Sequence, residues 1–305
     1  MIGDYFKFLS FKSLGILLGI LILVSCASHR PRPGHLSNAA SEASTKIIFI
    51  SAPDSTNLAP NFWKHLRSLN ADLAIFAGKI ASSSDLDDNR HFKKLLDVTP
   101  AFAIWNSSFS HDQESLEKSK ERFLDLWNEP KNSSRRSRPG VYDSFNVGPP
   151  GSSLQVILLD SRSFRSSKEL LGSDQWIWLK TQMKTPSDVR LIVCSEGILE
   201  NHRSVWNEFS RERSKLLKLV EESSGQSVFL TSNETATKLI KQKRSGKKRL
   251  VEFVSGPSNR ADFGFILIDW AKNGIHLEAR QSKDGSTTAI YELTTNPSRK
   301  KPSLQ

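Results

Sequence analysis

Short apolar runs alternate with longer amphipathic stretches over most of this sequence, and this alternation limits the fold more than any other feature. The apolar runs have the length and composition of buried strands: 46–50, 72–77, 99–105, 154–159, 189–194, 228–231, 250–255 and 263–270. The stretches that place apolar side chains on one helical face are 61–69, 91–96, 113–127, 173–179 and 211–221. Strands that alternate with helices predict sheets covered by helices.

The end of the chain departs from this alternation. Residues 274–280 and 287–293 read as strands that follow one another without a helix, and 140–147 alternates as a half-buried strand would. The polar stretch 128–140 is expected to be a loop, and Ser173 is expected to cap the helix that follows it. We therefore expect an α/β fold in which a two-sheet β-sandwich is flanked by helices on both outer faces.

The N-terminus, 1–25, has the pattern of an export signal. Lys7 and Lys12 precede an uncharged apolar core at 14–24. This core is too short for a permanent membrane span, which needs roughly 20 residues. The alternative, a buried core helix, fits poorly because a polar stretch follows at once.

Cys26 ends this segment in the sequence Leu23-Val24-Ser25-Cys26, which resembles the lipobox of bacterial lipoproteins. The resemblance implies that Cys26 is lipidated and holds the protein on a membrane. Ala27 follows where that family's signal for inner-membrane retention would be Asp, so we expect an exported, periplasm-facing lipoprotein, with the outer membrane favoured. The alternative is an ordinary cleaved signal with a chance cysteine.

The remaining chain divides into three parts. Residues 26–45 are rich in Ser, Ala, Pro and His and predict a flexible tether, and 296–305 predict a loose tail. Residues 46–295 are enough for one domain with a core. If Cys26 is lipidated, Cys194 has no partner for a disulfide, and its apolar run indicates a buried thiol.

The chain carries a formal net charge of +11, and one basic cluster stands out. Its members are Lys241, Lys243, Arg244, Lys247, Lys248 and Arg249. The simpler interpretation is a solvated loop that turns at Gly246. The functional one is contact with an anionic ligand or envelope surface. No stacking aromatic residues are interleaved with these cations, which argues against nucleic acid.

Several motifs between residues 46 and 293 resemble the PhoD family of alkaline phosphatases and phosphodiesterases. The longest are LGSDQWIWL at 171–179, VILLDSRSFR at 156–165, FGFILIDW at 263–270 and GVYDSF at 140–145, with FLDLW at 123–127 and a Trp206, Phe209, Arg211, Glu212, Arg213 segment. The resemblance implies the calcineurin-like metallophosphoesterase fold. It also implies a metal site, of iron and calcium in that family, at the ends of the strands.

The positions that match the family's metal ligands carry other residues here. Ala52 replaces a cysteine after the first strand, and Lys79 replaces an aspartate after the second. After the third strand, Asn106 and Ser107 stand where the family has two aspartates. Late in the chain, Asn233 and Thr235 replace an aspartate and a histidine.

These replacements predict that no metal cofactor is bound. Hard divalent ions need anionic oxygen ligands, and the Lys79 ammonium would repel such an ion even with strong screening. Asp54 is a stray carboxylate nearby, and His202 matches the region where the family lines its cleft. No residue is assigned a catalytic role. None of the serines falls in a nucleophile-elbow pattern, and Ser195 and His65 are weak candidates for nucleophile and base.

Three hypotheses follow. The first is a catalytically inactive PhoD-like lipoprotein of the envelope that binds an anionic ligand or a partner. The second is an active metal-dependent phosphomonoesterase or phosphodiesterase with an altered metal site. The third is an envelope protein with a purely structural role.

Overall fold

The structure is a computed structural model of the 305-residue chain. It describes residues 43–51, 60–78, 89–106, 115–199, 204–232, 238–242, 249–256, 263–281 and 284–295. The chain divides into residues 1–30 and 31–305, and every described residue belongs to the second unit. Within these described ranges, no helix has both the length and the apolar character needed to cross a membrane.

The first sheet has six strands in the order β12-β11-β10-β1-β2-β3. Its strands are β1 (Ser44–Ile50), β2 (Leu73–Phe76), β3 (Ala101–Ala103), β10 (Phe263–Asp269), β11 (Gly274–Arg280) and β12 (Thr287–Thr294). β1, β2 and β3 are parallel, whereas β10, β11 and β12 are joined as an antiparallel set. β1 begins two residues before the boundary expected from the sequence.

The second sheet also has six strands, in the order β4-β5-β6-β7-β9-β8. These strands are β4 (Asp143–Val147), β5 (Leu154–Leu159), β6 (Val189–Cys194), β7 (Gln226–Ser232), β8 (Lys238–Gln242) and β9 (Leu250–Ser255). The four central strands are parallel, and β4 and β8 are antiparallel edges. β5, β6 and β9 are buried along their whole length, as strands covered on both faces should be.

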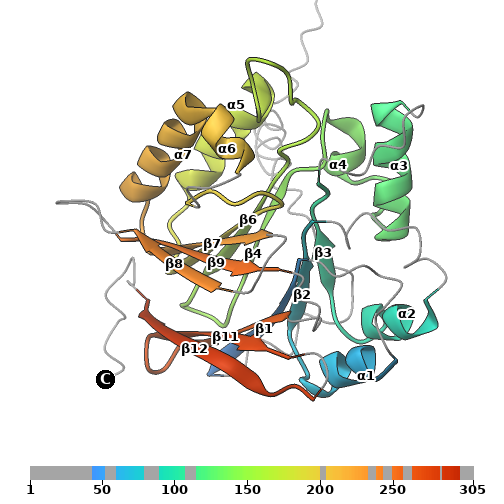
Figure 1. The fold of residues 1–305 in the computed structure, drawn as a ribbon, viewed down its shortest axis with the longest axis vertical. Coiled ribbons are helices and arrows are strands. Elements are labelled where there is room, and N and C mark those ends of the chain that lie inside the picture. The colour runs from blue at the N-terminus through green and yellow to red at the C-terminus, as the bar shows by residue number, and fades with distance from the viewer. Residues whose placement is uncertain are drawn as a thin grey trace, which may run out of the picture. The chain divides into compact units, whose positions relative to one another are not determined.

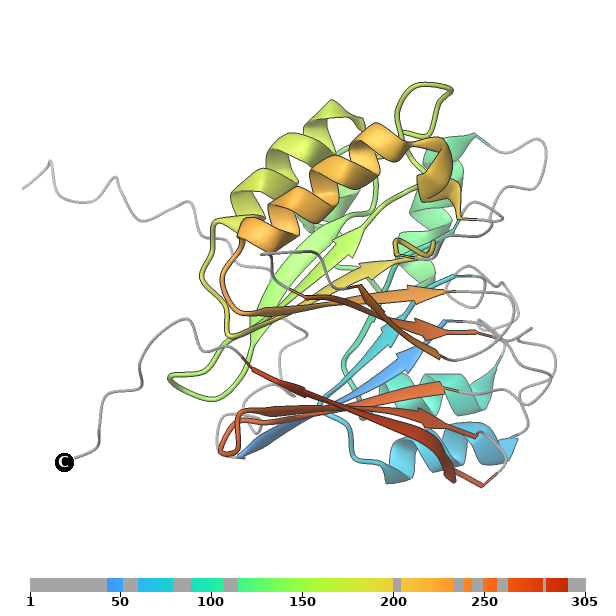
Figure 2. The same ribbon diagram turned by 60° about the vertical axis from the view of Figure 1, so that its left-hand side comes forward.

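Helices cover the outer faces of both sheets (Figures 1 and 2). α1 (Pro60–Ser68) and α2 (Arg90–Leu96) lie against the first sheet, and α5 (Gly172–Met183) and α7 (Ser210–Glu222) lie over the second. α3 (Leu116–Leu126), α4 (Ser134–Ser137) and α6 (Val205–Glu208) complete the described helices. The expected α/β sandwich with helices on both outer faces is confirmed.

The core lies between the two sheets and under the helices. Phe102 of β3 stacks on Phe145 of β4 with ring centroids 3.8 Å apart, which joins one sheet to the other. Under α1 and α2, Trp63 and Phe92 meet edge to face at 5.4 Å. Such aromatic pairs contribute about 0.5–1.5 kcal/mol beyond the area they bury.

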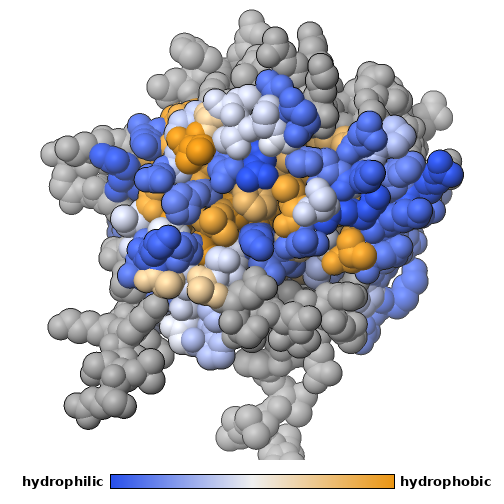
Figure 3. All heavy atoms as spheres, turned by 90° about the horizontal axis from the view of Figure 1, so that it is seen from below, coloured by the Kyte–Doolittle hydropathy of each residue, from blue (hydrophilic) through white to orange (hydrophobic). Residues whose placement is uncertain are grey.

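The face seen from below is mostly polar, with apolar groups gathered near its middle (Figure 3). Ile290 of β12, in the first sheet, is an exposed apolar residue, with 59% of its surface exposed. Single exposed apolar side chains of this kind are normal on a folded surface.

Three local expectations are wrong. The stretch 128–140 contains the short helix α4, whose first turn is capped by Ser133 at 3.1 Å from the Arg135 amide. Ser173 is not an N-cap, because the helix begins at Gly172 after a loop that the Glu212 carboxylate holds instead. Lys241 is not in a loop but in edge strand β8, opposite Val251 of β9. Lysines are common on such edges because they discourage further pairing.

Candidate functional site at the strand ends

The carboxyl ends of strands from both sheets meet at one place. The Ser51 hydroxyl, just after β1, donates a hydrogen bond to the carbonyl oxygen of Ser255, which ends β9. The Ser232 hydroxyl, at the end of β7, donates to the carbonyl oxygen of Ser51 at 3.4 Å. Two hydroxyls therefore join the first sheet to the second at this end, and both already hold backbone groups.

Gly78, just after β2, lies in the same junction. Its φ is +73°, and a β-carbon there would lie 2.3 Å from the Ser51 carbonyl oxygen and 2.6 Å from the Ser232 hydroxyl oxygen. Only glycine fits such a conformation and such a close approach. The ends of β1, β2 and β7 are thus packed directly against one another.

Three positions of the sequence-predicted site follow this junction directly in the sequence. Ala52, Lys79 and Asn233 directly follow Ser51, Gly78 and Ser232 in the chain. Six of the predicted positions lie outside the described residues, together with the lipidation candidate: Ala52, Lys79, Ser107, Asn233, Thr235, Asp54, and Cys26. His202 and most of the basic cluster, Lys243, Arg244, Lys247 and Lys248, also lie outside them.

Asn106 is described and is half-buried just after β3. Its neighbour Trp105 is fully buried and donates from its indole nitrogen to Asp160 at 2.8 Å. The Arg162 guanidinium lies over the Trp105 ring, 4.5 Å from the ring centroid. This stacking fixes the ring of Trp105, the residue directly before Asn106.

Asp160, which ends the LLD run, holds the loop after β5. Besides the Trp105 indole, its carboxylate accepts the backbone amides of Val141 at 2.7 Å, Arg162 at 2.9 Å and Ser163 at 3.0 Å. All of these donors are backbone amides or side chains of the protein, so the bonds serve to hold the fold. The Asp160 carboxylate therefore has a structural role.

The LGSDQWIWL motif is explained by two more sets of hydrogen bonds, one buried and one partly buried. Gln175 bonds both the amide and the carbonyl of Asp160, at 2.8 Å each, and so ties α5 to the end of β5. Glu212 of α7 accepts from the Trp176 indole at 2.8 Å and from the amides of Leu170 and Leu171. The motif thus specifies how α5, α7 and β5 are joined.

The loop after β6 is held by two charged residues from distant parts of the chain. Glu252 of β9 is fully buried and accepts the amides of Ile198 at 2.6 Å and Leu199 at 2.9 Å. Arg213 of α7 donates to the carbonyl oxygen of Ile198 at 2.6 Å. Sequence reasoning missed Glu252, although a glutamate inside the apolar run LVEFVS is itself a signal of a buried polar role.

Other side chains considered as chemical candidates have structural surroundings. Cys194 is buried, as expected, and burial raises the pKa of its thiol to about 12, so it is unreactive near neutral pH. Ser195 is buried, with its hydroxyl 3.2 Å from that of Ser161. His65 packs near the Phe263 ring, 5.9 Å between centroids, and burial lowers its pKa.

The described groups at the strand ends do not fit a metal ion. They are hydroxyls and carbonyls that bond one another, and hard cations require anionic oxygens. Over the part of the chain that the structure describes, no group of three or more His, Cys, Asp or Glu side chains could hold a metal. Two buried acids of the described residues, Asp160 and Glu252, are engaged by backbone amides of the protein.

No family model matches the sequence, and no curated protein matches it. Solved structures do. The structure of PhoD is 13% identical over 85% of this chain and 71% of that chain, with a TM-score of 0.61. GAP50, the anchor in the inner membrane complex of Plasmodium, is 14% identical over 85% and 91%, with a TM-score of 0.56.

Purple acid phosphatase PPD1 from yellow lupin (Lupinus luteus) seeds is 9% identical over 84% of this chain and 55% of that chain, with a TM-score of 0.57. Identities this low establish the likeness of fold and nothing about chemistry. The layers and sheets agree with those expected from the motifs in the sequence. The described part of this chain therefore has the metallophosphoesterase fold seen in PhoD.

Proposed function

We propose that this protein is a lipid-anchored, non-hydrolysing relative of the PhoD-type phosphatases, located in the bacterial envelope, which acts by binding an anionic ligand or a partner. One observation carries the proposal. The ends of β1, β2 and β7 meet in one junction, and the residues that follow them in sequence are Ala52, Lys79 and Asn233. None of the three can supply an anionic ligand to a metal.

Electrostatics give this observation its weight. A divalent ion about 5 Å from an ammonium group is repelled by about 7 kcal/mol at an effective dielectric constant of 20. An aspartate at the same place would attract the ion by a similar amount. A lysine in place of the aspartate therefore turns an attraction for the metal ion into a repulsion of similar size, and a few neutral ligands do not offset this change.

The same groups suit an anion. Lys79 brings a positive charge, and Asn106 and Asn233 bring amide donors, which together match a phosphate or carboxylate group. Backbone amides donate to the buried carboxylates of Asp160 and Glu252 and hold the loops after β5 and β6 in place, and a binding site requires rigid support of this kind. GAP50 is described as an anchor, so this fold also occurs in a protein with a role of that kind.

The decisive experiment measures metal content and turnover together. Full-length protein is purified without added chelator, its metals are counted by mass spectrometry, and hydrolysis of bis(p-nitrophenyl) phosphate is followed. We expect metal well below one ion per chain and no turnover above the blank. Stoichiometric iron, calcium or zinc together with turnover would establish the alternative, an active phosphomonoesterase or phosphodiesterase with an altered metal site.

Anion binding has its own test. Inorganic phosphate is titrated into the full chain by calorimetry, with Lys79→Gln as the test variant and Lys64→Gln, an exposed lysine of α1, as the matched control. Binding should weaken in the first variant alone. Equal phosphate affinity in both variants would remove Lys79 from the site.

The anchor at Cys26 is tested by incorporation of labelled palmitate in bacterial cells. The label should be lost in Cys26→Ala, because the thioether to the lipid is made on sulfur. Label that persists in this variant contradicts the anchoring proposal. Fractionation of the same cells shows which membrane carries the wild-type protein, for which the outer membrane is proposed.

A further inference from the structure

A cavity lies at the other end of the sandwich from the strand-end junction. It has a volume of about 610 Å³ and is lined by the start of β7, the start of β9, the β10–β11 turn and the end of β12. Gln226 lines it at one end of β7, whereas Ser232 at the other end belongs to the junction. Six residues of strand correspond to about 20 Å, so the two sites are separate.

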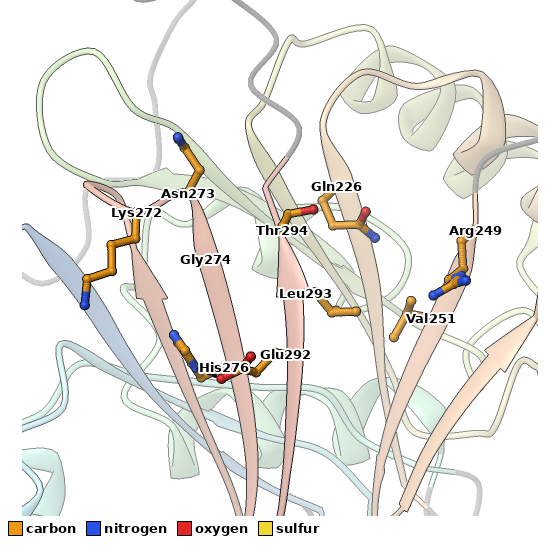
Figure 4. A pocket seen from close by; sticks show the side chains of 10 residues that line it. All are labelled: Gln226, Arg249, Val251, Lys272, Asn273, Gly274, His276, Glu292, Leu293 and Thr294. Carbon is orange, nitrogen blue, oxygen red and sulfur yellow. Dashed lines mark ion pairs between the residues drawn. The ribbon is translucent and has the colours of Figure 1, made fainter.

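The lining combines an apolar floor with hydrogen-bonding groups. Leu293 of β12 and Val251 of β9 face each other across it, and the Gln226 amide, the Thr294 hydroxyl and the Arg249 guanidinium lie around them (Figure 4). Pockets for small ligands have this make-up, with a few polar groups around an apolar interior and volumes of roughly 300–1,000 Å³.

Arg249 is the cation available to a ligand. It is exposed, and in the described ranges no acidic side chain forms an ion pair with it. The other charged groups of the lining, Lys272 and Glu292, each lie close to another side chain of the protein. Lys272 lies 3.6 Å from Asp269, and its ammonium points away from Arg249 (Figure 4). Glu292, whose side chain is largely exposed, lies 3.5 Å from His276, and this contact is an ion pair only when the imidazole is protonated.

We infer that this cavity binds a small organic anion, a carboxylate or phosphate group attached to a short apolar chain. The planar guanidinium of Arg249 can hold the two oxygens of such a head group at once, and Gln226 can add a further hydrogen bond. The chain of the ligand then covers Leu293 and Val251, whose apolar surfaces gain from leaving water.

A free metabolite and a lipid head group share this chemistry. The domain's first residue in the structure, Ala43, accepts a hydrogen bond from the Trp270 amide at 2.8 Å, next to the β10–β11 turn. The chain that precedes Ala43 therefore enters the domain at the end that carries the cavity. The inference itself does not depend on the anchor.

The probes are hexanoate, hexyl phosphate and hexanol, titrated into the full chain in nonionic detergent by calorimetry. Both anions should bind, and hexanol should bind at least tenfold more weakly, because it has the apolar chain without the charge. Arg249→Gln should weaken both anions about tenfold. The matched control is Lys64→Gln, an exposed lysine of α1 that does not line the cavity, and it should change them less than twofold.

Vesicles distinguish the two sources of the anion. Stronger binding to phosphatidylglycerol than to phosphatidylcholine vesicles, reduced by Arg249→Gln, identifies a lipid head group, and soluble anions binding without this preference identify a free ligand. Failure of both soluble anions to bind at millimolar concentration, or equal affinity in Arg249→Gln, overturns the inference. The part of hexanoate binding that Arg249→Gln removes should be unchanged in Lys79→Gln, so this site and the strand-end proposal can fail independently.

Discussion

Asp160→Asn is the substitution that best tests how this domain is held together. The Asp160 carboxylate is fully buried and accepts hydrogen bonds from the Trp105 indole, the Ser163 hydroxyl and the amides of Val141, Arg162 and Ser163. Asparagine has the same shape but replaces one accepting oxygen by an NH₂ group. Either the indole of Trp105 or the amide of Val141 must then face a donor.

The cost follows from the number of bonds lost. A buried donor left without an acceptor costs about 1–3 kcal/mol, and the remaining bonds lose the strength that the carboxylate charge gives them. We expect the free energy of unfolding to fall by about 2–5 kcal/mol. This is a large part of the roughly 5–15 kcal/mol that stabilises a typical domain.

Urea unfolding followed by tryptophan fluorescence measures this loss. The matched control is Asp174→Asn, an exposed carboxylate on α5, which should change stability by no more than about 0.5 kcal/mol. The reasoning is refuted if Asp160→Asn costs less than about 1 kcal/mol with an unchanged denaturant slope. Asp160 would then be dispensable to the frame and would have to be reconsidered as part of a site.

Three further changes test other contacts. Gly78→Ala should destabilise the domain by about 2–4 kcal/mol, and by at least about 1 kcal/mol more than Gly151→Ala, which shares a positive φ but has open space around it; equal losses in thermal or urea unfolding would contradict the close packing. Burial, and after it the Arg280 guanidinium, lowers the pKa of His65. Its contribution to stability is therefore complete above about pH 6.5 and is lost as pH falls through the lower folded pKa. The free energy of unfolding, measured from pH 7.5 to 5, should fall more steeply in the wild type than in His65→Gln, and parallel curves would count against this. Cys194, in a chain whose other cysteine is replaced, should react with a thiol reagent at pH 8 only after unfolding, because burial raises its pKa to about 12; rapid labelling of the folded protein would be inconsistent with that burial.

Much of the architecture could be predicted from the sequence alone. The runs 46–50, 154–159 and 189–194 are apolar apart from Lys46, Gln155 and Arg190, which predicts buried strands, and the structure confirms them. Helices with one apolar face had to lie outside them. Periodicity reports which face of an element leaves water, and this information is local to each segment.

Local sequence patterns gave wrong predictions where a residue distant in sequence makes the contact that decides the structure. Ser173 looked like a helix cap, but the Glu212 carboxylate, some forty residues away, satisfies the amides before α5. Lys241 looked like part of a charged loop, but pairing with β9 makes it a strand residue. In both places the partner is distant in sequence, so no local pattern could reveal it.

The candidate site divides in the same way. The sequence by itself determined the chemical character of the residues at the positions that resemble the family's metal-ligand motifs, where Lys79 and Asn233 are poor metal ligands. Only the tertiary structure decided that the ends of β1, β2 and β7 meet, that Asp160 and Glu252 serve the frame, and that Arg249 borders a cavity. Chemical character belongs to each residue, whereas proximity between strands of two sheets arises only when the chain packs.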